Sequence, residues 1–152
     1  MKIKAVNEKD FDRIIEIWES AVRATHFFLN ENDINYYRPQ IREVYLHQVD
    51  LLGAFDDDGL LQGFMGLSPK AADHPERLEM LFVHDDVRGQ GLGRALIESA
   101  LALAGGELEL EVNEQNPGGL LFYEKMGFEI IGRQEVDSEG RPFPLLKMRH
   151  RS

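Results

Sequence analysis

Apolar and polar residues alternate along the chain with two periods, one typical of helices and the other of strands. Helical spacing of apolar side chains predicts a first helix from Phe11 to Val22 and a second over residues 33–46, which Pro39 is expected to kink or split. Further helices are expected after the glycines near residue 90 and after Asn116. Short apolar or alternating runs predict strands at residues 2–6, 51–55, 60–68, 78–83, 107–112, 128–136 and 145–149.

This order of elements predicts one α/β (α+β) domain over residues 1–152. Its sheet is expected to be mixed and mostly antiparallel, with six or seven strands and about four helices. Asn7 with Asp10 is a candidate helix cap, and residues 57–59, Asp-Asp-Gly, are typical of a hairpin turn. Residues 73–77 are predicted to form a polar loop before the fourth strand.

Residues 87–96, VRGQGLGRAL, place Gly89, Gly91 and Gly93 between a predicted buried strand and an amphipathic helix. Without Cβ atoms these glycines allow a tight turn whose N–H groups approach an anion, and the helix start adds further unpaired N–H groups. A phosphate-binding loop is therefore expected. It is not a Walker loop, because Gly93 is followed by Arg94 rather than by Lys. A dinucleotide fingerprint is disfavoured, since the loop lies past the middle of the chain.

The remaining pattern, Arg-x-x-Gly-x-Gly over residues 88–93, resembles the acetyl-CoA pyrophosphate loop of the Gcn5-related N-acetyltransferase (GNAT) family. A second segment, NEQNPGGLLFYEKMGF, is similar to the family motif N-x-x-A-x-x-x-Y-x-x-x-G-F, and it departs only at Gly119, where alanine is usual. The resemblance covers essentially the whole chain, and the segments VRATHFFL and GRQEVDSEGRPFPLLKM are similar to one bacterial subgroup. The matching motif positions are Asn116, Tyr123, Gly127 and Phe128.

This resemblance implies a GNAT fold in which the fourth and fifth strands run parallel and splay apart around the pantetheine arm of acetyl-CoA. Backbone groups of Leu81 and Val83 would pair with pantetheine like an added strand, and one N–H there would polarise the thioester carbonyl. The Asn116 side chain would bind the same arm. The acetyl-CoA contacts expected are Leu81, Phe82, Val83, Arg88, Gly89, Gln90, Gly91, Leu92, Gly93, Arg94, Asn116 and Phe122.

Acetyl transfer to an amine requires a proton acceptor, because an amine with a pKa of about 10.4 is neutral in only about one molecule in 2,500 at pH 7. Glu79, on the fourth predicted strand, is the first candidate, since bacterial members of the family often carry Glu there; the alternative is a solvent-facing strand residue. His26 is the second candidate, and the alternative is an ordinary packed histidine. His84 is expected to be structural. Phe27 and Phe28 are predicted either to line an acceptor pocket or to fill the core.

Tyr123 is expected to act as the general acid, because the resemblance places its hydroxyl beside the sulfur of the departing CoA thiolate. A phenol pKa near 10 exceeds a thiol pKa near 8.5, so the donation is uphill by roughly 2 kcal/mol, which is small against an enzymatic barrier. The alternative role for Tyr123 is that of a core aromatic beside Phe122.

Composition narrows the chemistry further. The chain has no cysteine, which excludes disulfides, thiolate metal sites and an acyl-cysteine intermediate, so direct transfer in a ternary complex is expected. No two of the five histidines are spaced as a helical pair, and no metal is expected. The net charge of −10 favours a cationic partner over nucleic acid.

No apolar run approaches the ~18 residues of a membrane span and no signal-peptide pattern is present, which predicts a soluble, cytoplasmic protein without a membrane partner.

These observations predict an acetyl-CoA-dependent N-acetyltransferase that acts on a basic amine, with a peptidyl lysine as one possible acceptor. One alternative is a small-amine acetyltransferase that uses a polyamine, an amino acid or an antibiotic. Another is a non-catalytic acyl-CoA-binding module, which Tyr123 and the complete glycine loop disfavour. Residues 25–46 are expected to determine acceptor specificity, but they contain no sequence motif from which the acceptor can be identified. Both a monomer and a homodimer fit the sequence.

Overall fold

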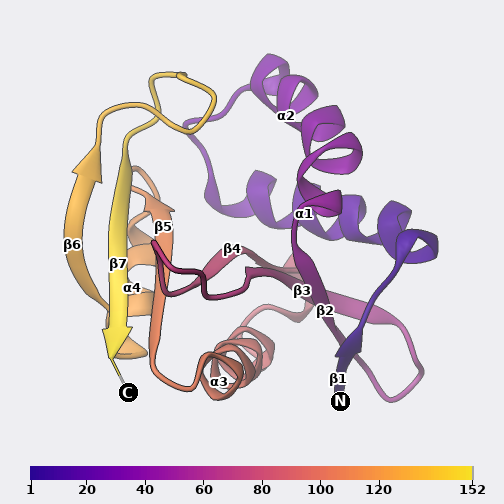
Figure 1. Ribbon diagram of the computed structural model, residues 1–152. Coiled ribbons are helices and arrows are strands. Elements are labelled where there is room, and N and C mark those ends of the chain that lie inside the picture. Colours follow the sequence, from indigo (N-terminus) through magenta and orange to yellow (C-terminus); the bar gives the residue numbers. More distant parts are fainter. Residues whose placement is uncertain (152) are drawn as a thin grey trace.

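The computed structural model describes residues 1–151 as one seven-stranded sheet with helices on both faces (Figure 1). The strands are β1 (Lys2–Ala5), β2 (Asp50–Phe55), β3 (Leu61–Ser68), β4 (Glu76–Val83), β5 (Glu107–Asn113), β6 (Glu129–Gln134) and β7 (Leu145–Arg151). The helices are α1 (Phe11–Thr25), α2 (Glu31–Glu43), α3 (Leu92–Ala104) and α4 (Pro117–Lys125), with short 3-10 turns η1 (Glu8–Asp10), η2 (Tyr45–His47) and η3 (Asp85–Val87).

The strands lie in the order β1-β2-β3-β4-β5-β7-β6. Every neighbouring pair is antiparallel except β4 and β5, which are parallel. The predicted fold class, with its mixed sheet and parallel central pair, is therefore confirmed.

The parallel contact between β4 and β5 is short. Only residues 76–78 pair with residues 108–110, and beyond Leu78 the two strands separate, as the resemblance implied. The last rungs are held by an ion-pair cluster of Arg77, Glu109 and Arg149, which are in register across β4, β5 and β7. Glu109 is buried; it accepts a hydrogen bond from Arg149 Nε at 3.0 Å and lies 3.9 Å from Arg77 Nε. This Glu109 cluster links β4, β5 and β7 at the middle one of the three β4–β5 pairs, one pair before the splay.

Two hydrophobic cores lie on opposite faces of the sheet. Helices α3 and α4 cover one face, where Leu78, Leu96 and Leu110 belong to a core that extends from β2 to β7. Helices α1 and α2 cover the other face, and their core, which includes Trp18 and Phe64, takes its described strand residues from β2, β3 and β4. Helices α1 and α2 therefore leave the face formed by β5, β7 and β6 uncovered (Figure 1).

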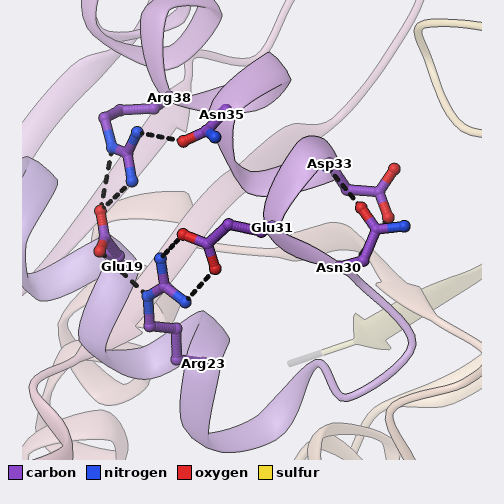
Figure 2. Close-up of polar contacts among 7 residues, drawn as sticks. All are labelled: Glu19, Arg23, Asn30, Glu31, Asp33, Asn35 and Arg38. Atoms are coloured by element: carbon purple, nitrogen blue, oxygen red, sulfur yellow. Dashed lines mark hydrogen bonds and ion pairs between the residues drawn. The ribbon is translucent and has the colours of Figure 1, made fainter.

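Helices α1 and α2 are joined by ion pairs around Glu19 (Figure 2). Glu19 binds both Arg23 and Arg38, and the hydrogen bond from Arg38 is the main reason why the pKa of Glu19 is lowered. Arg23 also forms a two-pronged pair with Glu31, with N–O distances of 2.8 and 2.6 Å. These contacts tie the start and middle of α2 to α1.

The second predicted helix was wrong at both ends. Helix α2 begins at Glu31, because Asn30 and Asp33 form a reciprocal capping box, which stabilises a helix start two residues before the expected one. It continues through Pro39 to Glu43, and only then gives way to η2. Pro39 removes one N–H donor, but the apolar residues on both sides of it, Ile34 and Ile41, are buried and hold the helix together.

Most other boundaries agree with the sequence to within two residues. Asn7 and Asp10 form the expected capping box, on η1 immediately before α1. Gly59, in the predicted hairpin turn, has a φ of 82°. One loop was wrong, since β4 begins at Glu76, inside the segment expected to be a polar loop. Pairing with β5 begins at that same residue and accounts for the longer strand.

Replacing Glu109 by Gln should destabilise the protein by about 1–3 kcal/mol, because the isosteric amide keeps one acceptor but leaves two arginines without their shared counter-charge. Urea unfolding followed by circular dichroism measures the change. Glu98→Gln is the matched control, since Glu98 pairs with Arg94 on the surface and its loss should cost no more than about 0.5 kcal/mol. Equal costs for the two variants would contradict a structural role for the Glu109 cluster.

Candidate active site

A β-bulge in β4 lies at the base of the splay. Gly66 of β3 pairs with Met80, whereas the next residue, Leu67, pairs with Leu78, so Glu79 is an extra residue in β4. Such a bulge turns a side chain away from the regular alternation and often lies beside an active site. Glu79 is exposed, although Leu78 before it is buried. The predicted base therefore lies immediately after the last residue of β4 that pairs with β5.

The backbone of β4 beyond the bulge has one free edge. His84 N–H donates to Gln62 of β3 at 2.8 Å, and the Phe82 carbonyl also lies against β3. In an antiparallel strand the N–H and C=O groups of alternate residues point to opposite neighbours. The backbone groups of Leu81 and Val83 consequently point away from β3, into the space that β5 has left. These are the two residues expected to pair with pantetheine.

The glycine loop turns the chain from β4 into α3. Gly89 and Gly91 have φ values of 84° and 86°, a left-handed conformation that other residues rarely adopt, and a Cβ on either would meet no atom within 4 Å. Among the described residues no backbone hydrogen bond is found for the N–H groups of residues 89–91. The first N–H groups of α3 add to these, because a helix start leaves them without intrahelical partners. The loop is an open cradle of N–H donors beside the positive end of a helix.

His84 is structural, as expected. Its Nδ1 accepts a hydrogen bond from Asp86 N–H at 3.1 Å and caps η3, the turn that leads into the glycine loop.

A single cavity of about 570 Å³ connects the glycine loop, the splay and the first helix. All three predicted catalytic residues, Glu79, His26 and Tyr123, line it. Of the expected cofactor contacts only Gln90 does not. The others that line the cavity are Leu81, Phe82, Val83, Arg88, Gly89, Gly91, Leu92, Gly93, Arg94, Asn116 and Phe122.

Tyr123 lies on α4 between two aromatic rings. It makes edge contacts with Phe122 and Phe128, at centroid distances of 5.2 and 5.8 Å. Burial raises the pKa of its hydroxyl well above the ordinary value, so the phenol stays protonated even at alkaline pH. Phe122 reaches the start of α3, where a Cβ on Gly93 would lie 3.4 Å from the Phe122 ring. Tyr123 is both a packed aromatic and a residue of the cavity wall.

The protonation of His26 follows from its neighbours. The Thr25 hydroxyl donates its one proton to the Ala21 carbonyl at 2.7 Å, so it accepts at 2.8 Å from His26 Nδ1–H. This arrangement leaves Nε2 unprotonated. Burial lowers the pKa of His26 to about 4, and the ring is therefore neutral at pH 7.

Asn116 caps α4 and lies against Gly119, the one position that departs from the family motif. Its Oδ1 accepts a hydrogen bond from Gly119 N–H at 3.2 Å, which leaves its amide N–H₂ as the group able to donate to a ligand. A Cβ at residue 119 would lie only 2.6 Å from Asn116 Nδ2. Alanine at this position would require the Asn116 side chain to shift.

Sequence reasoning passed over one carboxylate of the cavity wall, Glu111. Leu108, Leu110 and Val112 of β5 belong to the core beneath α3 and α4, so the intervening Glu109 and Glu111 lie on the opposite face. Because Leu78 pairs with Leu110, Glu111 is the first β5 residue beyond the parallel contact, as Glu79 is on β4. The alternation of acidic and leucine residues along β5 was the sequence feature that could have predicted that Glu111 lies on the face opposite this core.

Comparison with known proteins identifies the family. Residues 47–130 match the Acetyltransferase (GNAT) domain. Since this match covers more than half of the chain, the protein belongs to the GNAT family and is an N-acetyltransferase.

The chain is 40% identical over 151 residues to the peptidyl-lysine N-acetyltransferase YjaB of Salmonella typhimurium strain LT2, covering 97% of each protein. It is 36% identical to YjaB of Escherichia coli K12, covering 97% of this chain and 95% of that protein. The solution structure of apo YjaB from Escherichia coli superposes with a TM-score of 0.87, over 98% of this chain and 96% of that one. These are the bacterial subgroup that the sequence resembled.

A PaiA N-acetyltransferase from Thermoplasma acidophilum, crystallised with coenzyme A, shares the fold with a TM-score of 0.82 at 22% identity, over 99% of this chain and 98% of that one.

No helix within residues 1–151 is long and apolar enough to cross a membrane. Nor does that part of the chain gather three or more His, Asp or Glu side chains around a possible metal position, although the absence of a metal stays a prediction.

Coenzyme A at 100 times its dissociation constant should stabilise the protein by about 2.7 kcal/mol, measured as a rise in melting temperature. Gly91→Val should abolish this rise, because a side chain there would project into the cradle. Gly105→Val is the matched control: Gly105 ends α3 with a φ of 61° and equally open surroundings, so it suffers similar backbone strain far from the cradle. A normal coenzyme A response in the Gly91 variant would refute the cradle.

Proposed function

We propose that this enzyme transfers the acetyl group of acetyl-CoA directly to the side-chain amine of a lysine in a protein. The observation that carries the proposal is that one cavity connects an open cradle of N–H donors, the unpaired edge of β4, the partly buried phenol of Tyr123 and two carboxylates. Acetyl-CoA supplies the acetyl group as an activated thioester. Groups of this chain would bind acetyl-CoA, accept the proton of the amine and donate a proton to the departing thiolate.

The glycine loop and the start of α3 would hold the diphosphate through backbone N–H groups, with Arg88 and Arg94 adding positive charge at the cavity wall. The backbone of Leu81 and Val83 would bind the pantetheine amides as an added strand, and Asn116 would donate to the same arm. A backbone N–H at the splay would hydrogen-bond the thioester oxygen, where negative charge develops in the transition state.

Glu79 is the proposed proton acceptor. It is a carboxylate at the point where the two strands separate, which is also where an amine entering from the α1 and α2 side would meet the thioester. Glu111 occupies the matching position on β5 and would help to hold an ammonium group before it loses its proton. His26, neutral and with Nε2 free, is the competing acceptor.

Tyr123 is the proposed proton donor to the departing thiolate. Burial raises the pKa of its phenol, but the same desolvation acts on a thiolate held in the same cavity. The difference between the two pKa values, which governs the transfer, is therefore changed less than either value alone.

Two observations favour a protein lysine as the acceptor. Two relatives that match nearly the whole chain, the YjaB proteins of Salmonella typhimurium and Escherichia coli, are both named peptidyl-lysine N-acetyltransferases. A net charge of −10 favours association with a cationic protein surface. Acetylation of lysine peptides, compared with polyamines and free amino acids by thiol release, tests this choice of acceptor.

Glu79→Gln should lower turnover about 10²- to 10⁴-fold at pH 7, and less at pH 10, where much of the amine is already neutral. The pH profile of kcat/KM measures this rescue, with His26→Ala and Glu111→Gln assayed in parallel. Only the true proton acceptor should give a deficit that shrinks as the pH rises. A flat deficit for Glu79→Gln would reduce Glu79 to a substrate-binding residue.

Tyr123→Phe should reduce kcat about 10²- to 10⁴-fold while coenzyme A affinity and melting temperature stay near those of the wild type, because only the phenolic oxygen is removed and the packed ring remains. Initial-rate plots for the wild type should intersect, as direct transfer without an acyl-enzyme requires. Parallel lines, or an unchanged kcat in the Phe variant, would contradict this mechanism.

A further inference from the structure

The loop between β6 and β7 is bound to α2 by a group of contacts centred on Arg141, which we call the Arg141 clip. Arg141 Nη2 donates to Asp33, a buried carboxylate of α2, and its guanidinium lies 4.3 Å from the centre of the Tyr36 ring. The loop carboxylates complete the clip, since Asp137 accepts from the Tyr37 hydroxyl and Glu139 from the Tyr36 hydroxyl.

The clip joins the two parts of the molecule that flank the splay. Helix α2 packs with α1 and the core that includes β2, β3 and β4, whereas residues 137–143 connect the two strands at the far edge of the sheet. In Figure 1 this loop leaves β6, approaches the segment that leads into α2 and returns to β7. Figure 2 shows Glu31 turned toward Arg23 of α1 and Asp33 turned away from it, so the two carboxylates serve different partners.

A continuous row of rings leads from the clip to the cavity. Arg141 lies 5.9 Å from the centre of Phe143, which contacts Phe28 at a centroid distance of 5.6 Å. Phe28 in turn contacts His26 at 5.3 Å, and His26 lies 6.5 Å from Phe82 of β4. Phe27 points outward and is 82% exposed, so it is neither core nor part of this row.

We infer that the Arg141 clip positions the acceptor side of the cavity: through Phe143 and Phe28 it holds His26 in place as a wall of the site that receives the amine. Arg141 is thus a positioning residue for the acceptor. The inference rests on the proposed function, because it assigns the His26 side of the cavity to the amine. The cofactor cradle, on the opposite face at the start of α3, has no contact with the clip among the described interactions.

Arg141→Gln should raise the KM for the amine acceptor about ten- to hundredfold, because displacing the wall formed by His26 weakens the binding of the amine. The KM for acetyl-CoA should stay within about twofold of the wild type. Arg141→Lys should lie between the two, because lysine keeps the charge but loses the flat fork that stacks on Tyr36. Tyr37→Phe removes only the hydrogen bond to Asp137 and should cause a smaller rise of the same kind.

Arg133→Gln is the matched control, because Arg133 forms an exposed ion pair with Glu114 and lies outside the cavity lining. It should leave both KM values unchanged. If the Arg141 variants change both KM values equally, or neither, the inference is overturned.

A second measurement does not depend on turnover. The His26 ring, titrated by NMR, should move from a pKa of about 4 toward its ordinary value in Arg141→Gln, because opening the clip lets water reach it, while Arg133→Gln leaves it unchanged. An unchanged His26 titration in Arg141→Gln would refute the clip itself. A wild-type enzyme that acetylates no amine, with the His26 shift present, would instead refute the proposed function.

Discussion

The structure depends on how briefly β4 and β5 run together. Three residue pairs hold them, the Glu109 cluster lies at the middle pair, and the strands part after the third. Parallel strands have no turn between them to enforce their spacing, so their connection through α3 permits separation where an antiparallel hairpin would resist it. The separation exposes a strand edge that faces a cavity rather than solvent, and every proposed catalytic group lies around that edge.

The buried and exposed parts of this cavity carry groups of different charge. Desolvation disfavours the ionised form of both Tyr123 and His26, so one is a phenol and the other a neutral imidazole at pH 7. Glu79 lies outside this buried part, because the bulge turns it out to an exposed position at the base of the splay. Neutral groups line the buried part of the site, and carboxylates stand where a cationic amine would enter.

Local patterns in the sequence predicted the elements well, since strand and helix periods depend on nearby residues. Pro39 does not split α2, because its local penalty is outweighed by the packing of Ile34 and Ile41, which only the folded chain reveals. The site was predicted from motifs that are contiguous, such as the glycine loop. Glu111 and Arg141 were missed because their roles depend on register between strands and on contacts between residues more than a hundred positions apart.

Asp33 has one further consequence, for the way sequences of this kind can change. Its Oδ2 accepts from Asn30 N–H and closes the cap of α2, while its Oδ1 accepts from Arg141. Loss of this carboxylate would remove both contacts at once, so the start of a helix in the first quarter of the chain and a loop near its end depend on the same side chain.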